Sequence, residues 1–513
     1  MNIFSFSPFG YEGAMVNVEV DLRRGIPSVD VVGLADSAVK ESRERMRAAI
    51  RNSGFEFPQD RVLISLSPAD VKKEGAGFDL AIALAVLAAK SEFAGGEDCL
   101  VMGELDLSGK VRPVRGINAA VSTAREQGIT WCIVPKDNER EALNAGRGVC
   151  AVESLTQAFS CLGAAVRGES PYDPASIGSS LQGTEEVCFA PLDPAMDFSA
   201  VKNQGRLVRA LQIAAAGGHN LIAYGPPGCG KTLSIQRIPS ILPCLSLEES
   251  RTVTRIYSLA GLIPPGGEPI KARPFRAPHQ SATLEGMAGG GHQCRPGEIS
   301  LAHNGVLFLD EAAEFRTSVL QSLRIPLELG SITLSRAGRH TVFPARFQLL
   351  MATNPCPCGN YGSPDRICVC SPHSVEQYWK KFSVPLLDRI DIRVPLPGSS
   401  SDEERFSYYD GISSAKLRPS IALAVHMQRR RQGKNNASLT PEEISTKIVL
   451  EEEAESTFEE LTVSSNFSGR AEHSILKLSR TIADLEGCEK VNSNHIIEAY
   501  EFRKNEGGLD ICF

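Results

Sequence analysis

The sequence LIAYGPPGCGKT occupies residues 221–232 and decides the fold class of this 513-residue chain. Its first four residues form an apolar run typical of a buried strand, and the other eight fit the pattern G-x-x-x-x-G-K-[ST]. Glycines in such a loop let backbone N–H groups point at phosphate oxygens, a lysine adds positive charge, and a threonine offers a hydroxyl to Mg²⁺. The pattern predicts an α/β P-loop domain that binds ATP through Gly225, Pro226, Pro227, Gly228, Cys229, Gly230, Lys231 and Thr232.

A second apolar run, residues 306–309, ends in the acidic pair Asp310 and Glu311. An uninterrupted apolar run is typical of a buried parallel strand, and ligands bind beyond the carboxyl ends of such strands. We expect Asp310 to hold Mg²⁺ through water. We expect Glu311 to act as the general base that polarises the attacking water.

A third strand is predicted over residues 347–352, and Asn354 and Pro355 follow it. An asparagine at this strand end, beside the other two, would orient the attacking water. Spacing alone equally favours a turn-forming asparagine before a proline. Both interpretations stay open on the residues alone.

The segments around these motifs resemble a known family. They are RALQIAAAGGHN (209–220), GPPGCGKT (225–232), RPFRAPH (273–279), PGEISLAHNGVLFLDE (296–311) and NPCPCGNYG (354–362). They resemble the magnesium-chelatase-like AAA+ family and, within it, the ComM/YifB competence-associated ATPases. The resemblance implies an AAA+ module that assembles as a homo-oligomeric ring, usually a hexamer, with each ATP held between two subunits.

The same resemblance assigns roles to single residues. It makes Asn354 the sensor that orients water, Arg389 the arginine finger that reaches a neighbour's γ-phosphate, and Arg470 the second sensor on a helical lid. Cations at these places would stabilise the negative charge that spreads in the transition state. The chain departs from the family at Gln280, where a second histidine is usual, and at Ser474, where an arginine is common.

Four cysteines lie close together in a segment rich in turn residues: Cys356, Cys358, Cys368 and Cys370. Four thiolates around Zn²⁺ would replace the hydrophobic core that such a loop lacks, in a structural site without an open position. The C-x-C spacing is tighter than the usual C-x2–4-C, and the alternative is four free thiols. The sequence favours zinc over that alternative.

Two basic segments are candidate contacts for DNA phosphates. Residues 332–335 and 340–343 alternate like the strands of a hairpin, with Arg336 and Arg339 in its turn. A hairpin before the sensor strand resembles the pore hairpin of related ring helicases, but a solvated basic turn explains the pattern equally well. For the basic run Arg429–Arg431, a solvated helix face is favoured over DNA contact.

The whole chain is predicted to hold three domains. Residues 1–167 alternate short strands with helices, and MGELDLSGKVRPV (102–114) resembles the Lon-protease fold, a ribosomal S5-type α/β domain. That family's catalytic serine and lysine fall at 73–79 and 118–120, where this chain has no serine and, near 118–120, no lysine. A Ser–Lys pair needs both members, so the domain is expected to be non-catalytic. A linker is expected at 168–189, the AAA+ domain with the cysteine loop at 190–395, and a helical lid domain at 396–513.

Composition excludes several classes of protein. Lysine and arginine total 54 against 61 acidic residues, a net charge of −7, so any contact with DNA must be local. The best apolar run, residues 80–89, is half the length of about 20 that a membrane span needs. The start MNIFSFSPFGYEG resembles no secretory signal, which favours the cytoplasm and predicts that the 14 cysteines are free thiols or metal ligands.

The sequence therefore predicts an ATP-driven ring motor on DNA, a helicase for branch migration in homologous recombination or natural transformation. One alternative is the ATPase subunit of a metal chelatase that acts on a tetrapyrrole; the Lon-like domain and the cysteine cluster count against it. A second is a regulatory module that uses ATP only to change shape, which the complete set of predicted catalytic residues disfavours. An ATP-dependent protease is disfavoured by the missing serine and lysine.

Overall fold

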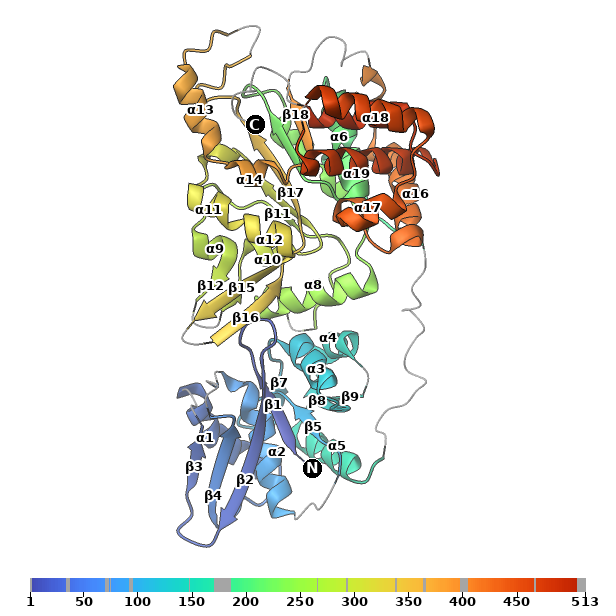
Figure 1. The fold of residues 1–513 in the computed structure, drawn as a ribbon. Helices are drawn as coiled ribbons and strands as arrows, with labels where there is room; N and C mark the ends of the chain where they lie inside the picture. Colours follow the sequence, from blue (N-terminus) through green and yellow to red (C-terminus); the bar gives the residue numbers. More distant parts are fainter. Residues whose placement is uncertain are drawn as a thin grey trace.

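The computed structural model describes residues 2–33, 37–69, 73, 75–91, 96–146, 148–169, 186–264, 266–291, 294–336, 339–362, 366–396, 405–465 and 467–504. Along this part of the chain, an N-terminal α/β part is followed by a second sheet with its helices and then by a group of C-terminal helices (Figure 1). Among the described helices, none combines the length and the apolar composition needed to cross a bilayer.

The N-terminal part is built on a mixed seven-stranded sheet with the order β3-β4-β2-β1-β5-β8-β9. Its central helix is α2, in which nine successive residues from Asp79 to Leu87 are buried. The elements are β1 (Ile3–Ser7), β2 (Ala14–Arg23), β3 (Val29–Val32), α1 (Ser37–Asn52), β4 (Arg61–Ser67), α2 (Asp79–Lys90), β5 (Cys99–Val101), β6 (Glu104–Leu105), β7 (Val111–Arg112), α3 (Ile117–Glu126), β8 (Trp131–Pro135), α4 (Glu139–Ala145), β9 (Val149–Val152) and α5 (Leu155–Val166).

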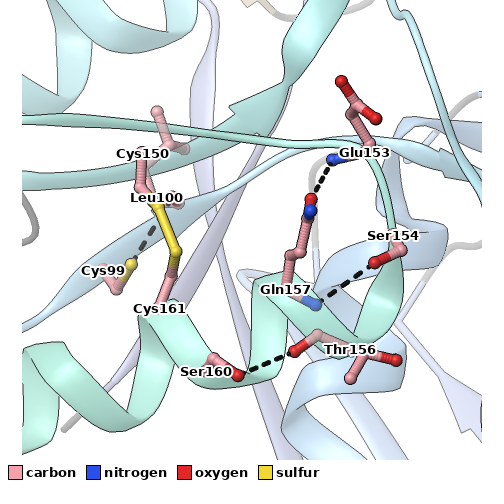
Figure 2. The surroundings of a disulfide bond; sticks show 9 residues. All are labelled: Cys99, Leu100, Cys150, Glu153, Ser154, Thr156, Gln157, Ser160 and Cys161. Atoms are coloured by element: carbon pink, nitrogen blue, oxygen red, sulfur yellow. Dashed lines mark hydrogen bonds between the residues drawn. A yellow bond between two sulfur atoms is a disulfide. The ribbon is translucent and has the colours of Figure 1, made fainter.

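A disulfide joins Cys150 of β9 to Cys161 of α5 (Figure 2). The chain reverses between the two elements, and the Gln157 N–H donates to Ser154 Oγ (3.3 Å) at the start of the helix. The Gln157 side chain in turn accepts from the Glu153 N–H (2.8 Å). This capped turn lays α5 back along β9. The prediction that the cysteines are free thiols or metal ligands is therefore wrong for this pair.

The second sheet has five strands in the order β11-β14-β17-β10-β18, and all its neighbours are parallel. The elements of this part are α6 (Gly205–Gly217), β10 (Leu221–Tyr224), α7 (Lys231–Ile235), α8 (Leu247–Leu259), β11 (Phe275–Arg276), α9 (Leu284–Ala288), β12 (Gly289–Gly290), β13 (Arg295–Pro296), α10 (Glu298–Leu301), β14 (Val306–Leu309), α11 (Thr317–Ser322), α12 (Arg324–Leu329), β15 (Ser331–Arg336), β16 (Arg339–Pro344), β17 (Gln348–Thr353), α13 (Pro372–Lys380), α14 (Val384–Leu387) and β18 (Ile392–Pro395).

Full burial explains why the central strands of this sheet read as continuous apolar runs. Every residue of β10, β14 and β17 is buried. A parallel sheet has both faces covered, so its strands show no alternation of polar and apolar residues. The strands predicted at 221–224 and 306–309 are confirmed, and the third begins one residue later than predicted and ends at Thr353.

The C-terminal helices are α16 (Ser414–Gln432), α17 (Pro441–Lys447), α18 (Glu452–Ser465), α19 (Gly469–Glu486) and α20 (Ser493–Arg503). Among them, α16, α19 and α20 share one hydrophobic core with α6 and the face of the sheet that α6 covers, while α17 contributes Ile444 to a second cluster. A buried ion pair joins the two groups, because Arg209 of α6 donates to Glu498 of α20 (2.8 Å). The predicted helical character of this region is confirmed.

The N-terminal part contacts the second sheet's domain through the loop between β1 and β2 (Figure 1). The backbone N–H of Tyr11 donates to Thr341 Oγ1 of β16 (2.9 Å), and this hydroxyl donates to Glu12 (2.8 Å). Arg255 of α8 stacks on the Tyr11 ring at 4.5 Å and pairs with Glu126 of α3 (3.2 Å). A cation, an aromatic ring and hydrogen bonds therefore fix this junction.

Much of the predicted linker, residues 170–185 of 168–189, lies outside the described residues. Near its end, Phe189 forms a bridge with Pro243, and the Cys244 N–H donates to the Cys188 carbonyl (2.8 Å). The chain is therefore already bound to the second domain at these residues.

Candidate active site

The predicted site residues gather at one edge of the five-stranded sheet. β10, β17 and β14 are adjacent and parallel, so the loops that follow them leave from the same edge, which we call the carboxyl edge. The phosphate loop (residues 225–232) follows β10, the acidic pair follows β14, and Asn354 follows β17. The Gly225 N–H donates to the Thr353 carbonyl (3.3 Å), which joins the first of these loops to the third.

Backbone geometry explains the glycines of the phosphate loop. Gly228 and Gly230 have φ values of 85° and 86°, a conformation that L side chains rarely adopt. At Gly225 a Cβ atom would lie 2.1 Å from the Leu396 carbonyl oxygen, so this position has no room for a side chain. Gln204, at the start of α6, donates to the Cys229 carbonyl (2.8 Å) and holds the loop from its other side.

Lys231 lies inside the loop that it terminates. Its Nζ donates to the carbonyls of Gly225 (2.7 Å) and Pro226 (2.8 Å), and the residue is buried. Burial lowers the pKa of Lys231, while the charges of Cys229 and of the acidic pair oppose that shift. The ammonium group of Lys231 therefore lies within the loop where the motif predicts phosphate.

Thr232 and Asp310 touch, although 78 positions separate them in the sequence. The Thr232 hydroxyl donates to Asp310 Oδ1 (2.9 Å), and the same oxygen accepts the Glu311 N–H (3.0 Å). A hydroxyl and a carboxylate side by side are the hard oxygen donors that Mg²⁺ prefers, with water completing its coordination. The donor set therefore fits the predicted metal ion.

Glu311 combines an exposed side chain with an unusual backbone. Its φ of 48° lies in the left-handed region, which costs a residue with a side chain about 1–2 kcal/mol. Buried Ala312 and Ala313 follow it and fix the turn. Such conformations persist only where the surrounding structure holds them in place, and they are found mostly at functional sites. The turn presents the carboxylate at the carboxyl edge, next to Asp310.

Asn354 lies against the phosphate loop through a third residue, Gly359. A Cβ atom at Gly359 would stand 2.9 Å from Pro227 Cδ and 4.0 Å from Asn354 Cγ. The indole N–H of Trp379 in α13 donates to the Pro355 carbonyl (3.0 Å) and fixes the chain just after Asn354. Asn354 thus follows β17 at the carboxyl edge and precedes a turn, so the sensor role and the turn-forming role both stay predictions.

The structure brings the four predicted cysteines together. Cys356 and Cys358 follow β17, Cys368 and Cys370 precede α13, and their sulfur atoms all lie within 4.8 Å of one another. Individual Sγ–Sγ distances are 3.4 Å between Cys356 and Cys358, 3.7 Å between Cys356 and Cys368, and 3.5 Å between Cys358 and Cys368. We call residues 356–370 the cysteine loop.

Arg389 lies at the opposite edge of the sheet, where the strands begin, which we call the amino edge. The N–H groups of Asp391 and Ile392 donate to the carbonyl of Asn220, the residue just before β10 (3.1 and 3.0 Å). The Arg389 guanidinium pairs with Glu328 of α12. The structure therefore does not bring Arg389 to the phosphate loop of its own chain.

Arg470 also belongs to the amino edge. It is exposed in the first turn of α19, and Ser474, one turn further, donates to Asp391 Oδ1 (2.8 Å). Burial and, less strongly, the charge of Arg470 lower the pKa of Arg503, which donates to the Ile390 carbonyl. The departure at Ser474 thus has a structural use, because its short hydroxyl donates to a partly buried aspartate.

The predicted hairpin is present as β15 and β16, which pair in antiparallel register from Ser331–Pro344 to Arg336–Arg339. Both arginines belong to the paired strands, whereas the sequence predicted them in the turn. Residues 337–338 and the side chains of Arg336 and Arg339 lie outside the described part of the structure. The proposed DNA contact of these two arginines therefore stays a prediction.

The basic run at 429–431 serves the C-terminal helices in part. Arg431 donates to both carboxylate oxygens of buried Asp484 (2.8 and 2.7 Å), and Lys434 pairs with Glu443 (2.7 Å). Arg429 and Arg430 are exposed.

Sequence reasoning also missed two residues that contact the phosphate loop, Gln204 and Gly359. Both are distant from that loop in the sequence, so no local motif marks the contact.

Three protein-family models match this chain. "Magnesium chelatase, subunit ChlI" matches residues 197–404, "Subunit ChlI of Mg-chelatase" matches residues 18–138, and "Magnesium chelatase, subunit ChlI C-terminal" matches residues 411–503. The first covers the phosphate loop, the acidic pair, the cysteine loop and Arg389, and the third covers Arg470.

Among curated proteins, the chain is similar over nearly its full length to two named relatives. It is 39% identical over 502 residues to "Uncharacterized protein YifB" of Escherichia coli, with 96% of this chain and 95% of the relative covered. It is 36% identical over 505 residues to "Competence protein ComM" of Haemophilus influenzae, with 98% and 97% covered. A shorter similarity, 26% over 136 residues, links 25% of this chain to 18% of a Lon protease of Brevibacillus choshinensis. The chain belongs to the magnesium-chelatase-like AAA+ family, together with the YifB and ComM proteins.

Proposed function

We propose that this protein is an ATP hydrolase that assembles as a hexameric ring and moves on DNA, driving branch migration in recombination or natural transformation. The observation that carries the proposal is the contact of Thr232 with Asp310 beside Lys231 at the carboxyl edge. It unites the two halves of a nucleotide site that are distant in sequence.

The residues of the carboxyl edge divide the chemistry of hydrolysis among them. The loop amides and Lys231 bind the phosphates. Thr232 and Asp310 would hold Mg²⁺, which would neutralise phosphate charge. Glu311 accepts the proton of the attacking water as general base, and Asn354 orients that water. The exposed carboxylate of Glu311, and Gly359, which lies close to both Asn354 and Pro227 of the phosphate loop, support these roles.

The arginines of the amino edge complete the site of a neighbouring protomer. Arg389 and Arg470 lie across the sheet from the phosphate loop of their own chain, so a role in hydrolysis requires a second copy. A head-to-tail arrangement, in which one protomer's amino edge meets the next one's carboxyl edge, closes into a ring. In such a ring the arginines of one protomer contact the ATP of the next, so hydrolysis at one site affects the neighbouring protomer.

Two observations support DNA as the polymer. A full-length relative is named a competence protein, and the β15–β16 hairpin carries an arginine on each strand next to its turn. The net charge of −7 requires the contact to be local, as a hairpin contact is.

The direct test measures the ATPase rate with and without branched or single-stranded DNA, and then strand displacement. We expect DNA to raise the rate and ATP to drive branch migration. Glu311→Gln should retain ATP binding and lose turnover by about 10²–10⁴-fold, since an amide cannot take up the proton. Normal turnover of Glu311→Gln would remove Glu311 as the base, and an ATPase that ignores DNA would remove the motor.

A second candidate is the ATPase subunit of a metal chelatase, because all three matching family models carry that subunit's name. In that case a chelatase partner protein, and not DNA, would raise the ATPase rate. Adding such a partner with its tetrapyrrole substrate to the same assay separates the two candidates.

A further inference from the structure

We propose that the cysteine loop binds one structural Zn²⁺ through Cys356, Cys358, Cys368 and Cys370, and that this ion holds the segment after Asn354 against the phosphate loop. The inference depends on the proposed function only for its effect on turnover. The metal site itself rests on the four sulfur atoms and their surroundings.

The spacing of the sulfur atoms fits a tetrahedral thiolate site. Four ligands at a Zn–S distance of about 2.3 Å stand about 3.8 Å apart at the corners of a tetrahedron. The three pairs among Cys356, Cys358 and Cys368 stand at 3.4, 3.5 and 3.7 Å, and all four sulfurs lie within 4.8 Å of one another. With four protein ligands the site has no open position for water, so its role is structural.

The loop turns its sulfur inward and its hydrocarbon outward. Ile367 and Val369 are 87% and 84% exposed, while Cys368 and Cys370, which alternate with them, are partly buried. On the other arm, Cys356 is fully buried against the core around Trp379. A loop stabilised by the hydrophobic effect would bury the isoleucine and the valine. The centre of this loop is instead made of metal ligands.

A second group of possible metal ligands within the described residues shows what an ordinary hydrogen-bonded cluster looks like. Glu486, Cys488 and His495 lie together in the C-terminal helices. The Asn492 N–H donates to His495 Nδ1 (3.0 Å), so the ring proton resides on Nε2, which faces Glu486 (3.1 Å). Both ring nitrogens are therefore engaged by the protein. In the cysteine loop the sulfurs instead face one another, and Cys358, Cys368 and Cys370 accept backbone hydrogen bonds from within the loop, an arrangement that stabilises thiolates.

The loop is also where the metal would affect the candidate active site. Cys356 lies two residues after Asn354, and the Gly359 N–H donates to the Cys356 carbonyl (3.0 Å). This turn places Gly359 so close to Pro227 that a Cβ atom would be 2.9 Å from its ring. Zinc on the cysteines thus fixes the turn that supports both Asn354 and the phosphate loop.

The first experiment is metal analysis of the purified full-length chain by mass spectrometry, with Co²⁺ substitution as a second readout. We expect one zinc per chain, and in the cobalt form the intense visible bands of a tetrahedral thiolate site. The double variant Cys358→Ser/Cys370→Ser should lose both signals, whereas Cys188→Ser, at an exposed cysteine outside the loop, should keep them. A chain that contains no zinc and binds neither ion, or that carries disulfides within the loop under reducing conditions, overturns the proposal.

A second pair of variants tests the link to the active site without touching a thiol. Gly359→Ala should retain its zinc and bind ATP, yet lose about tenfold or more in turnover, since small displacements of positioning groups are costly. Gly362→Ala is the matched control, because Gly362 also has a positive φ (74°) but has no atom within 4 Å of an added Cβ. Equal turnover in the two variants would show that the cysteine loop does not affect the active site. The separate measurement of zinc content would still show whether the metal site exists, and its result does not depend on whether DNA raises the ATPase rate.

Discussion

The two edges of the central sheet differ in how their charged groups are satisfied. At the carboxyl edge, Lys231, Thr232 and Asp310 converge within one chain, and a strained, exposed Glu311 stands beside them. At the amino edge, Arg389 is paired with Glu328, and α19 is tied to the sheet through Asp391. The comparison supports the proposal that one chain supplies the groups that bind and cleave the nucleotide, while its arginines serve the site of a neighbouring protomer.

The largest expected effect comes from the carboxyl edge. Lys231→Ala removes the cation of the phosphate loop, so ATP binding and transition-state stabilisation are both lost, and kcat/KM for ATP should fall by about 10⁴-fold or more. Steady-state ATPase kinetics and nucleotide titration check this. The hydrogen bonds of the Lys231 side chain stay within the phosphate loop, so their loss should leave the rest of the fold intact. Circular dichroism should therefore show an unchanged fold. A variant with near-normal turnover would place the site elsewhere.

Arg389→Ala is the corresponding change at the amino edge. It should lower kcat by about 10³-fold while the affinity for ATP stays unchanged, since the arginine acts only on the charge of the transition state. Glu328→Gln is the control, because it releases Arg389 from its ion pair but keeps the guanidinium. Loss of ATP affinity in Arg389→Ala would mean that this arginine belongs to the binding pocket of its own chain.

Arg470→Ala should have a smaller effect. The loss of one charge-assisted hydrogen bond to phosphate is expected to lower kcat by about 10- to 100-fold. Arg430→Ala, at another exposed arginine of the C-terminal helices, should leave the rate unchanged. If the two variants behave alike, Arg470 is a surface residue and the amino edge contributes Arg389 alone.

The smallest effect concerns the stability of the amino edge. Ser474→Ala removes a hydrogen bond to the partly buried Asp391 and should lower the free energy of unfolding by about 1–2 kcal/mol. Burial alone would raise the pKa of Asp391, but hydrogen bonds from His219 and Ser474 hold it below its usual value. Urea denaturation measures the change, with Ser456→Ala on exposed α18 as the control. Equal stability in both variants would show that Ser474 does not anchor α19.

The sequence predicts the parts of this molecule that local chemistry encodes. Continuous apolar runs reveal β10 and β14, because buried parallel strands tolerate little else. The phosphate loop and the four cysteines are readable from spacing. The disulfide between Cys150 and Cys161 was missed, because spacing says nothing about which elements lie side by side. The contact of Tyr11 with Thr341 and the left-handed backbone of Glu311 depend on residues far away in the sequence. No local sequence pattern predicts them.

The division of the active site between protomers is tested most directly by mixing two inactive variants. Lys231→Ala retains its arginines, and Arg389→Ala retains its phosphate loop. In rings assembled from equal amounts of both, about one interface in four joins an intact loop to an intact arginine. The account predicts that ATPase activity returns on mixing, to about a quarter of the wild-type rate per chain. A mixture that stays as inactive as its components would contradict it.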